Sequence, residues 1–312
     1  MRVAAVDCGT NSIRLLVADV CAGNKIDVHR EMRVVRLGQG VDRTGELAPE
    51  AIARTRVALV DYAATCRDLR AERIRMVATS ASRDARNRDD FRAMVLEVLG
   101  AEPEVISGDE EAALSFDGAT RGLDPADGPF LVMDIGGGST ELVLGTVVGG
   151  KASVQAARSV DVGCVRLTER HLAGDPPTPD EIACAQADVD GALVLVRQVV
   201  PVEQARTAIG LAGSVTTVAA IALDVPAYDS ERIHLSRLPA ADIRTVTDRL
   251  LAMTRDERAA LPVMHPGRVD VIGAGALVLA TLVDRLGLPG VLVSEADILD
   301  GIAWSAVQQG EL

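Results

Sequence analysis

Aromatic residues are scarce in this 312-residue sequence, where Phe, Tyr and Trp together make up 2% of the chain. Proteins that bind single-stranded nucleic acid without sequence preference stack the bases on exposed rings, so this class is disfavoured. Basic residues are also in deficit, with 32 Lys and Arg against 45 Asp and Glu and a net charge of −13. No general attraction to nucleic acid or to an anionic membrane is expected. A polyanionic substrate would have to be held by local features.

Cysteines and long apolar runs are few as well. The five cysteines are odd in number and contain no C-x-x-C pair, which predicts reduced thiols in a cytoplasmic protein and no zinc or disulfide framework. The longest apolar stretch, Val271 to Val283, is shorter than the roughly 20 residues that span a bilayer. The N-terminus reaches Asp7 after only four apolar residues, so we expect no signal peptide.

A glycine-rich segment dominates what the sequence does contain. Residues 134–141 read DIGGGSTE and lie between the apolar runs 130–132 and 142–144. Short apolar runs on both sides predict a β-hairpin with the glycines in its turn. A P-loop or a Rossmann fingerprint is excluded, because each needs a strand followed by a helix. Glycine amides can approach an anion closely, and the flanking acids suggest a metal; a plain hairpin turn is the alternative.

The same design occurs near the N-terminus. Residues 7–12 read DCGTNS, again between apolar runs, and Asp7 precedes Asp134 by 127 positions (134 minus 7). Gly9, Ser12 and Leu15 have counterparts at the same spacing. Two hairpins of one design could grip the phosphates of one nucleotide or polyphosphate from both sides.

Alternating strand and helix patterns in each half predict an α/β protein of two domains. The Gly122–Pro129 turn, with two prolines, is the best boundary, which gives domains 1–126 and 127–312. The final helix, 297–308, is a candidate to pack back on the first domain. We expect a helix to begin at 107–109 with Asp109 as its N-cap.

Three motifs together resemble the exopolyphosphatase and guanosine pentaphosphate phosphohydrolase (Ppx/GppA) family: 7–12, 108–112 (GDEEA) and 134–141. Further segments extend the resemblance over essentially the whole chain: 79–83, 163–169, 212–214 and 268–275. The resemblance implies two ribonuclease-H-like domains of the superfamily that includes actin, sugar kinases and heat-shock chaperone ATPases, with the active site in the cleft between them. This sequence looks like a short, two-domain form, which puts processive handling of long chains in doubt. Thr10 and Cys8 depart mildly from the family pattern.

Hydrolysis of a phosphoanhydride depends on positioning and charge neutralisation, because charge sits on the phosphoryl oxygens of a loose transition state. Backbone and hydroxyl donors would hold the phosphate, and carboxylates would hold a divalent cation, Mg²⁺ or Mn²⁺. The phosphate-binding candidates are Gly9, Thr10, Asn11, Ser12, Gly136, Gly137, Gly138 and Ser139, and the metal candidates are Asp7, Asp134 and Glu141. Capping of the turn by the aspartate side chains is the competing interpretation.

The base that orients the attacking water is Glu111 by resemblance, with Glu141 as the second catalytic candidate. Adjacent helical residues point to different faces, so Glu110 would be a solvated neighbour. The alternative for Glu111 is a surface carboxylate without a catalytic role, which the helix dipole would favour in the first turn of a helix.

Three further residues are candidates for additional phosphate contacts. Arg83 would clamp a phosphate or form a surface ion pair. Gly213 and Ser214, on a strand-to-helix turn, would receive phosphates at the helix N-terminus or simply cap the helix. The four histidines share no metal-ligand spacing, and we interpret them as structural.

These observations predict a metal-dependent hydrolase that removes the terminal phosphate of inorganic polyphosphate, guanosine pentaphosphate or both. Two alternatives stay open: a kinase of the same superfamily, and a regulator that binds either polyanion without hydrolysing it. By resemblance, a homodimer is also plausible.

Overall fold

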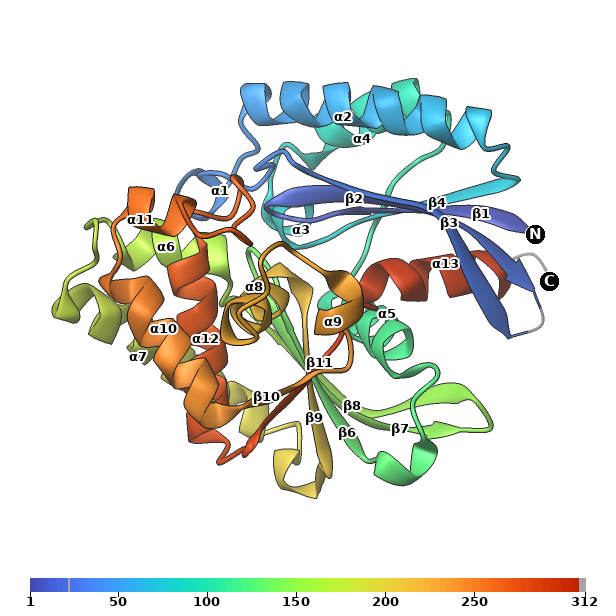
Figure 1. The fold of residues 1–312 in the computed structure, drawn as a ribbon. Helices are drawn as coiled ribbons and strands as arrows, with labels where there is room; N and C mark the ends of the chain where they lie inside the picture. Colours follow the sequence, from blue (N-terminus) through green and yellow to red (C-terminus); the bar gives the residue numbers. More distant parts are fainter. Residues whose placement is uncertain (22, 309–312) are drawn as a thin grey trace. The chain divides into compact units, whose positions relative to one another are not determined.

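The computed structural model describes residues 1–21 and 23–308, which form two compact units (Figure 1). Unit 1 comprises Met1–Gly118 and the chain from Asp297 onward, and unit 2 comprises Ala119–Ala296. The division lies inside one helix, α5. The domain limits of 1–126 and 127–312 stay a prediction.

Unit 1 contains a five-stranded mixed sheet in the order β3-β2-β1-β4-β5. The first three strands form consecutive antiparallel hairpins, whereas β4 and β5 run parallel to β1. The strands are β1 (Arg2–Cys8), β2 (Ser12–Cys21), β3 (Asn24–Val34), β4 (Arg73–Ala78) and β5 (Glu104–Val105); the helices are α1 (Val41–Thr44), α2 (Pro49–Asp68), α3 (Ser80–Asp84), α4 (Arg88–Leu99), α5 (Gly108–Thr120) and α13 (Ile298–Gln308).

Strand β1 has an apolar core on each face, because successive side chains of a strand point to opposite sides. Ala4 and Val6 join the core on the side of α2 and α4, whereas Val3 and Ala5 join the core on the side of α13. Helix α13 contacts β1, β2 and β4. The C-terminal helix therefore completes the sandwich around the first sheet.

Asp300 ties α13 to the edge of this sheet. Its Oδ1 lies 2.7 Å from the guanidinium of Arg30 and 3.0 Å from Nζ of Lys25, and its Oδ2 accepts a bond from the N–H of Asp297 at 3.0 Å. Burial raises the pKa of Asp300, but the charges of Arg30 and Lys25 outweigh burial and hold this pKa below its usual value.

We expect Asp300→Asn to lower the free energy of unfolding by roughly 3 kcal/mol at pH 7, because two cations lose their buried partner. A carboxylate with a depressed folded-state pKa stabilises the protein above its unfolded pKa of about 3.9 and loses this effect as the pH falls through the folded value. Urea unfolding at several pH values should therefore show the difference between wild type and variant shrinking below about pH 4. A difference that is constant from pH 7 to pH 3 would contradict this assignment; the exposed Asp61→Asn is the control.

Unit 2 contains a six-stranded mixed sheet in the order β10-β11-β9-β6-β7-β8. Its elements are η1 (Pro125–Asp127), β6 (Phe130–Ile135), β7 (Thr140–Val148), β8 (Lys151–Val160), α6 (Cys164–His171), α7 (Pro179–Arg197), η2 (Val202–Gln204), β9 (Thr207–Leu211), α8 (Ala212–Ala222), α9 (Ser230–Ile233), β10 (Arg237–Pro239), α10 (Ala240–Ala252), α11 (Arg255–Ala259), α12 (Ile272–Arg285) and β11 (Gly290–Val293). One extended apolar core joins the sheet to its helices.

The duplication seen in the sequence extends to both sheets. Strands β6, β7 and β8 repeat the antiparallel order of β1, β2 and β3, and the parallel neighbours β9 and β11 repeat β4 and β5. The second and third strands of each sheet carry a register shift at Val17/Ala18 and at Leu144/Gly145, again 127 positions apart (144 minus 17). The predicted α/β class is confirmed, and each unit is built on the same plan.

One predicted helix start is wrong in detail. Asp109 is not the N-cap of α5, because it lies inside the first turn. The hydroxyl of Ser107 instead accepts from the N–H of Glu110 at 3.2 Å, and the Ser107 carbonyl accepts from Glu111. Serine is as good a cap as aspartate, so composition alone could not choose between them.

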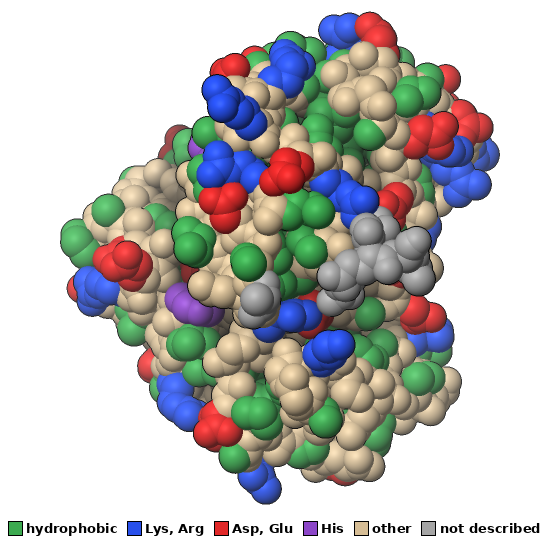
Figure 2. Space-filling model, turned by 90° about the vertical axis from the view of Figure 1, so that its right-hand side faces the viewer, with side chains coloured by type: hydrophobic (Ala, Val, Ile, Leu, Met, Phe, Trp, Pro, Cys, Tyr) green, Lys and Arg blue, Asp and Glu red, His purple; other side chains and the backbone are tan. Residues whose placement is uncertain are grey.

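The surface carries many ion pairs. On the face shown in Figure 2, acidic and basic side chains lie in small mixed groups.

None of the described helices combines the length and apolar character that a membrane crossing needs. All five cysteines are free thiols, as predicted.

Candidate functional site: two glycine hairpins and a buried carboxylate

The second glycine segment forms the predicted hairpin between β6 and β7. Its register pairs Asp134 with Glu141 and Ile135 with Thr140. The Gly136 N–H donates to the Ser139 carbonyl at 3.0 Å and closes the turn. The two acids flanking the glycines therefore lie directly opposite each other on adjacent strands.

The carbonyl groups of this turn are held by the segment that enters α6. The Gly136 carbonyl accepts from Cys164 N–H at 3.0 Å, and the Gly137 carbonyl accepts from Val165 N–H at 2.8 Å. The Gly138 carbonyl accepts from Nε of Arg166 at 2.7 Å. For the N–H groups of Gly137 and Gly138, no hydrogen bond to another described residue is found. These two donors are available to an anion.

Gly163 makes this arrangement possible. A Cβ at this position would lie 2.5 Å from the carbonyl carbon of Gly137 and 2.7 Å from the amide nitrogen of Gly138. Only glycine lets the backbone come so close. Sequence reasoning did not assign Gly163 a role at the site, because its contact lies more than 20 residues away along the chain.

The first hairpin repeats this geometry between β1 and β2. The Gly9 N–H donates to the Ser12 carbonyl at 2.9 Å, and the Thr10 and Asn11 carbonyls accept from the N–H groups of Gly38 and Arg36, each at 2.8 Å. Within the part of the chain that the structure describes, the N–H groups of Thr10 and Asn11 have no partner. They correspond to Gly137 and Gly138 by the 127-residue spacing.

Asp134 and Glu141 form a buried acidic pair with exposed fractions of 7% and 1%. The Ser159 hydroxyl donates to Oε1 of Glu141 at 2.7 Å and orients it. No group of three or more His, Cys, Asp or Glu side chains with metal-binding geometry occurs among residues 1–21 and 23–308. Mg²⁺ commonly takes only one or two protein carboxylates and completes its shell with water and phosphate oxygens. The pair fits that donor set.

Asp7 differs from its counterpart Asp134, because the residue opposite it is Arg14 and not an acid. Nε and a terminal nitrogen of Arg14 donate to Oδ2 of Asp7 at 2.9 and 2.7 Å, and the other terminal nitrogen binds Asp297. Burial raises the pKa of Asp7 above its usual value, although Arg14 opposes this shift. The Oδ1 atom of Asp7 has no bond to any other described residue, so one oxygen stays available.

We expect Arg14→Met to lower the free energy of unfolding by about 3–5 kcal/mol, because two buried carboxylates lose their cation. Arg92→Met is the matched control, since Arg92 pairs with Asp89 and Glu102 at the surface and such pairs contribute at most about 1 kcal/mol. Urea unfolding of both variants at pH 7 measures the two losses. Equal losses would mean that Arg14 is not the counter-ion of a buried pair.

Glu111 lies in the first turn of α5 and is 7% exposed. Its Oε2 accepts from a terminal nitrogen of Arg83 at 3.0 Å, and the same nitrogen donates to the Ile106 carbonyl at 3.1 Å. The predicted alternative of a surface charge is therefore wrong for Glu111, and the ion pair of Arg83 is not a surface pair. Glu110 is not simply solvated, because it binds Arg75 at 2.9 Å.

Thr10 connects the first hairpin to the segment that carries Arg83. The hydroxyl groups of Thr10 and Ser80 lie 2.8 Å apart, and both residues are buried. Helix α3 begins at Ser80, and Arg83 lies in its last turn. Within unit 1, this helix therefore connects Thr10, which is hydrogen-bonded to Ser80, with Glu111, which is bonded to Arg83.

Gly213 and Ser214 lie in the first turn of α8, directly after β9. The helix has Leu211 as its N-cap without a side-chain capping bond, so the capping alternative for these two residues is wrong. Arg268 packs on Gly213, where a Cβ would lie 2.4 Å from its guanidinium, and donates to the Gly213 carbonyl at 3.2 Å. Ala212 adopts a left-handed φ of 68°, a strained conformation for a non-glycine residue. Such strain is frequent at ligand-binding turns.

The structure therefore places the predicted residues in three groups: the first hairpin with Arg83 and Glu111, the second hairpin with its two acids, and the first turn of α8. Sequence reasoning missed the residues that hold these groups in place. Their partners are distant in the sequence: Arg14, Gly38, Gly163, Arg166, Arg268 and Asp297. Arg14 carried a usable signal, since it occupies the position that Glu141 holds in the second repeat.

Comparison with known proteins gives a consistent result. Residues 16–309 match the model of the Ppx/GppA phosphatase family. The chain is 57% identical to exopolyphosphatase 2 of Mycobacterium tuberculosis over 97% of this chain and 98% of that protein. It is 29% identical to the guanosine-5'-triphosphate,3'-diphosphate pyrophosphatase of Aeromonas salmonicida over 96% of this chain and 58% of that protein. A crystal structure of an exopolyphosphatase-like protein matches 99% of both chains with a TM-score of 0.95 at 42% identity.

Proposed function

This chain belongs to the Ppx/GppA phosphatase family, and on that premise we propose that it hydrolyses the terminal phosphoanhydride bond of inorganic polyphosphate and releases orthophosphate. The observation that carries the proposal is the matched pair of hairpin turns. Each turn has its carbonyls bonded to a later segment of the chain and two N–H groups left for an anion. The name of the mycobacterial relative, an exopolyphosphatase, supports the choice of substrate.

In this proposal both hairpins hold the end of one phosphate chain. Backbone amides that are fixed before the substrate arrives stabilise developing phosphoryl charge without reorganisation. Thr10 and Asn11 supply them from the first hairpin, and Gly137 and Gly138 supply them from the second. Because the chain has a net charge of −13, such local donors must outweigh a general repulsion of polyanions.

Glu111 acts as the base that orients the attacking water. Its pairing with Arg83 fixes the direction of the carboxylate, and a general base must be placed within reach of the proton that it accepts. Arg83 is therefore assigned to positioning Glu111. A Glu side chain accepts the proton of the water as the new P–O bond forms.

Asp134 and Glu141 would hold Mg²⁺ or Mn²⁺, with Oδ1 of Asp7 as a further oxygen. When bound, a divalent cation neutralises phosphate charge and polarises the bond that breaks. The opposed positions of the two acids and the bond from Ser159 support this assignment. Gly213 and Ser214 would receive later phosphates of the chain at the N-terminus of α8.

Guanosine pentaphosphate is the second candidate substrate. The Aeromonas relative is named for a guanosine nucleotide of this kind, and its terminal phosphoanhydride offers the same chemistry. Nothing in the hairpins distinguishes the two substrates, because both grip only phosphate.

Orthophosphate release from short polyphosphate, long polyphosphate and guanosine pentaphosphate tests the proposal. We expect release with Mg²⁺ or Mn²⁺ and none in EDTA. Tight binding without release in either metal would favour a regulator and overturn the hydrolase. Transfer of labelled phosphate from ATP to a metabolite mixture, in excess of hydrolysis, would favour a kinase.

A further inference from the structure

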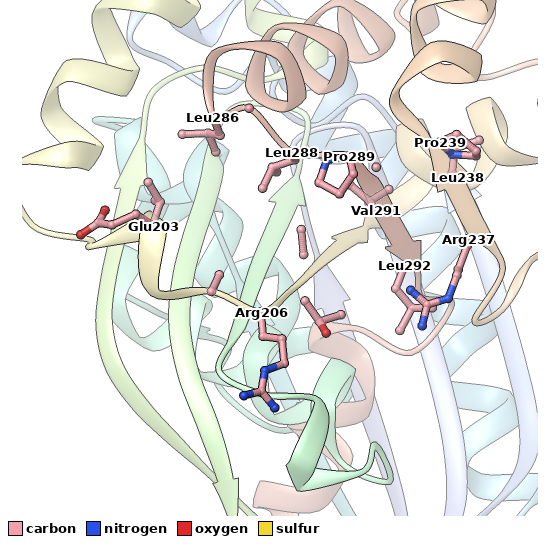
Figure 3. Close-up of a pocket in the computed structure, with 16 residues that line it drawn as sticks. Glu203, Arg206, Arg237, Leu238, Pro239, Leu286, Leu288, Pro289, Val291 and Leu292 are labelled. Atoms are coloured by element: carbon pink, nitrogen blue, oxygen red, sulfur yellow. The ribbon is translucent and has the colours of Figure 1, made fainter.

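Unit 2 contains a cavity of about 500 Å³ that the proposed reaction does not use (Figure 3). It opens at the starts of the parallel strands β9 and β11 and beside β10. The glycine turn and the Ala212–Ser214 turn follow the ends of β6 and β9, which run parallel. The cavity therefore lies at the opposite edge of the same sheet. Its volume is typical of sites for small organic ligands.

The cavity exists because two strands separate. The pairing of β9 with β11 covers only Ile209 with Leu292 and Gly210 with Val293. The register of β9 with β6 begins earlier, at Thr207, and that of β11 with β10 begins at Gly290, so the starts of β9 and β11 extend beyond their shared ladder. The cavity lies where this shared ladder has ended, among the first residues of both strands.

The upper wall of the cavity is apolar. Figure 3 shows Leu286, Leu288, Pro289 and Val291 along this wall, with Leu238 and Pro239 at its side. Proline and leucine side chains make apolar surfaces that can lie against a nucleic-acid base. A ligand that fills the cavity would therefore have an apolar or planar body.

Two arginines flank the lower part of the opening in Figure 3, Arg206 and Arg237. Arg206 donates to the Ala126 carbonyl at 2.6 Å, and within the described part of the chain neither arginine forms an ion pair. Glu203, the acid of the lining, points away from the opening (Figure 3). In a protein with 13 excess acids, two guanidinium groups without an acidic partner at one opening mark a site for an anion.

We propose that this cavity binds a nucleoside monophosphate. The phosphate would lie between Arg206 and Arg237, which suit it as fork-shaped donors. The base would lie against the leucine and proline wall. The cavity is separate from the β6–β7 hairpin of the same unit, and the proposal does not depend on the function of that hairpin.

Calorimetric titration of the full chain with GMP in EDTA tests the site. A saturating concentration of tripolyphosphate is added so that any phosphate site at the hairpins is occupied. We expect one GMP per chain, and a fall in affinity of about tenfold or more in Arg237→Ala, the size of a lost charge-assisted bond. Arg237 is exposed, and among the described residues its side chain forms no ion pair, so this variant should fold normally. Arg232→Ala, an exposed arginine outside the cavity, should bind GMP as the wild type does.

Guanosine and inorganic phosphate should each bind at least tenfold more weakly than GMP, because each lacks one half of the recognised chemistry. Equal affinity of wild type and Arg237→Ala, or displacement of GMP by tripolyphosphate, would overturn the proposal. Binding of inorganic phosphate as tight as that of GMP would also overturn it, since the apolar wall would then contribute nothing.

Discussion

Replacing Glu111 by glutamine should reduce orthophosphate release from polyphosphate by about 10²–10⁴-fold, the usual contribution of a positioned acid or base. Glutamine keeps the size of the side chain and an oxygen that can accept from Arg83 at the position now 3.0 Å away. It cannot accept a proton from water. The loss should therefore appear in kcat, and the affinity for tripolyphosphate should be nearly unchanged. Phosphate release and calorimetric binding measure the two effects.

Glu110→Gln is the matched control for this experiment. Glu110 is the adjacent residue of the same helical turn, with a side chain that is 46% exposed and paired with Arg75. Its replacement should leave phosphate release within about twofold of wild type, since Glu110 is partly exposed and Arg75 keeps its second partner, Glu104, at 2.7 Å. Release by Glu111→Gln at more than a tenth of the wild-type rate would show that another group orients the water.

Loss of the carboxylates at the second hairpin should have an effect of similar size. Asp134→Asn or Glu141→Gln should lower phosphate release by about 10³-fold, because metal assistance supplies several kcal/mol and each 1.36 kcal/mol is a factor of ten. Both acids are buried opposite each other across the β6–β7 ladder. The Mg²⁺ concentration for half-maximal activity should rise in both variants.

Ser159→Ala should have a smaller effect than replacement of either acid. Ser159 only orients Glu141, through the 2.7 Å bond, and supporting residues of this kind usually change metal affinity by about 10–100-fold. We expect its Mg²⁺ requirement to rise while the rate at saturating Mg²⁺ stays near that of wild type. If Asp134→Asn and Glu141→Gln kept the wild-type Mg²⁺ dependence, the metal would have to be bound elsewhere.

The hairpins could be predicted from the sequence because their information is local. Apolar runs on both sides of DCGTNS and DIGGGSTE define the strands, and a turn of so few residues sets the register. The 127-residue repeat predicted two equivalent loops, and the structure extends this equivalence to the bulges at Val17/Ala18 and Leu144/Gly145. Local pattern and local structure agree here, as expected for natural sequences.

The contacts that fix the hairpins could not be predicted in the same way. Gly163 and Gly38 lie against the turns from later segments, and Asp297 binds Arg14 across 283 residues. Such contacts depend on the tertiary packing, and the periodicity of the sequence does not predict them. The left-handed Ala212 is similar, because a residue that strongly disfavours this conformation gives no local signal for it.

The central claim is that the two hairpins hold one phosphate chain. A crystal structure of Glu111→Gln with tripolyphosphate and Mn²⁺ tests it most directly. The account predicts one phosphate within hydrogen-bonding distance of the amides of Thr10 and Asn11 and of those of Gly137 and Gly138, and Mn²⁺ about 2.1 Å from an oxygen of Asp134 or Glu141. Tripolyphosphate bound to one hairpin alone, with the other facing solvent, would contradict it.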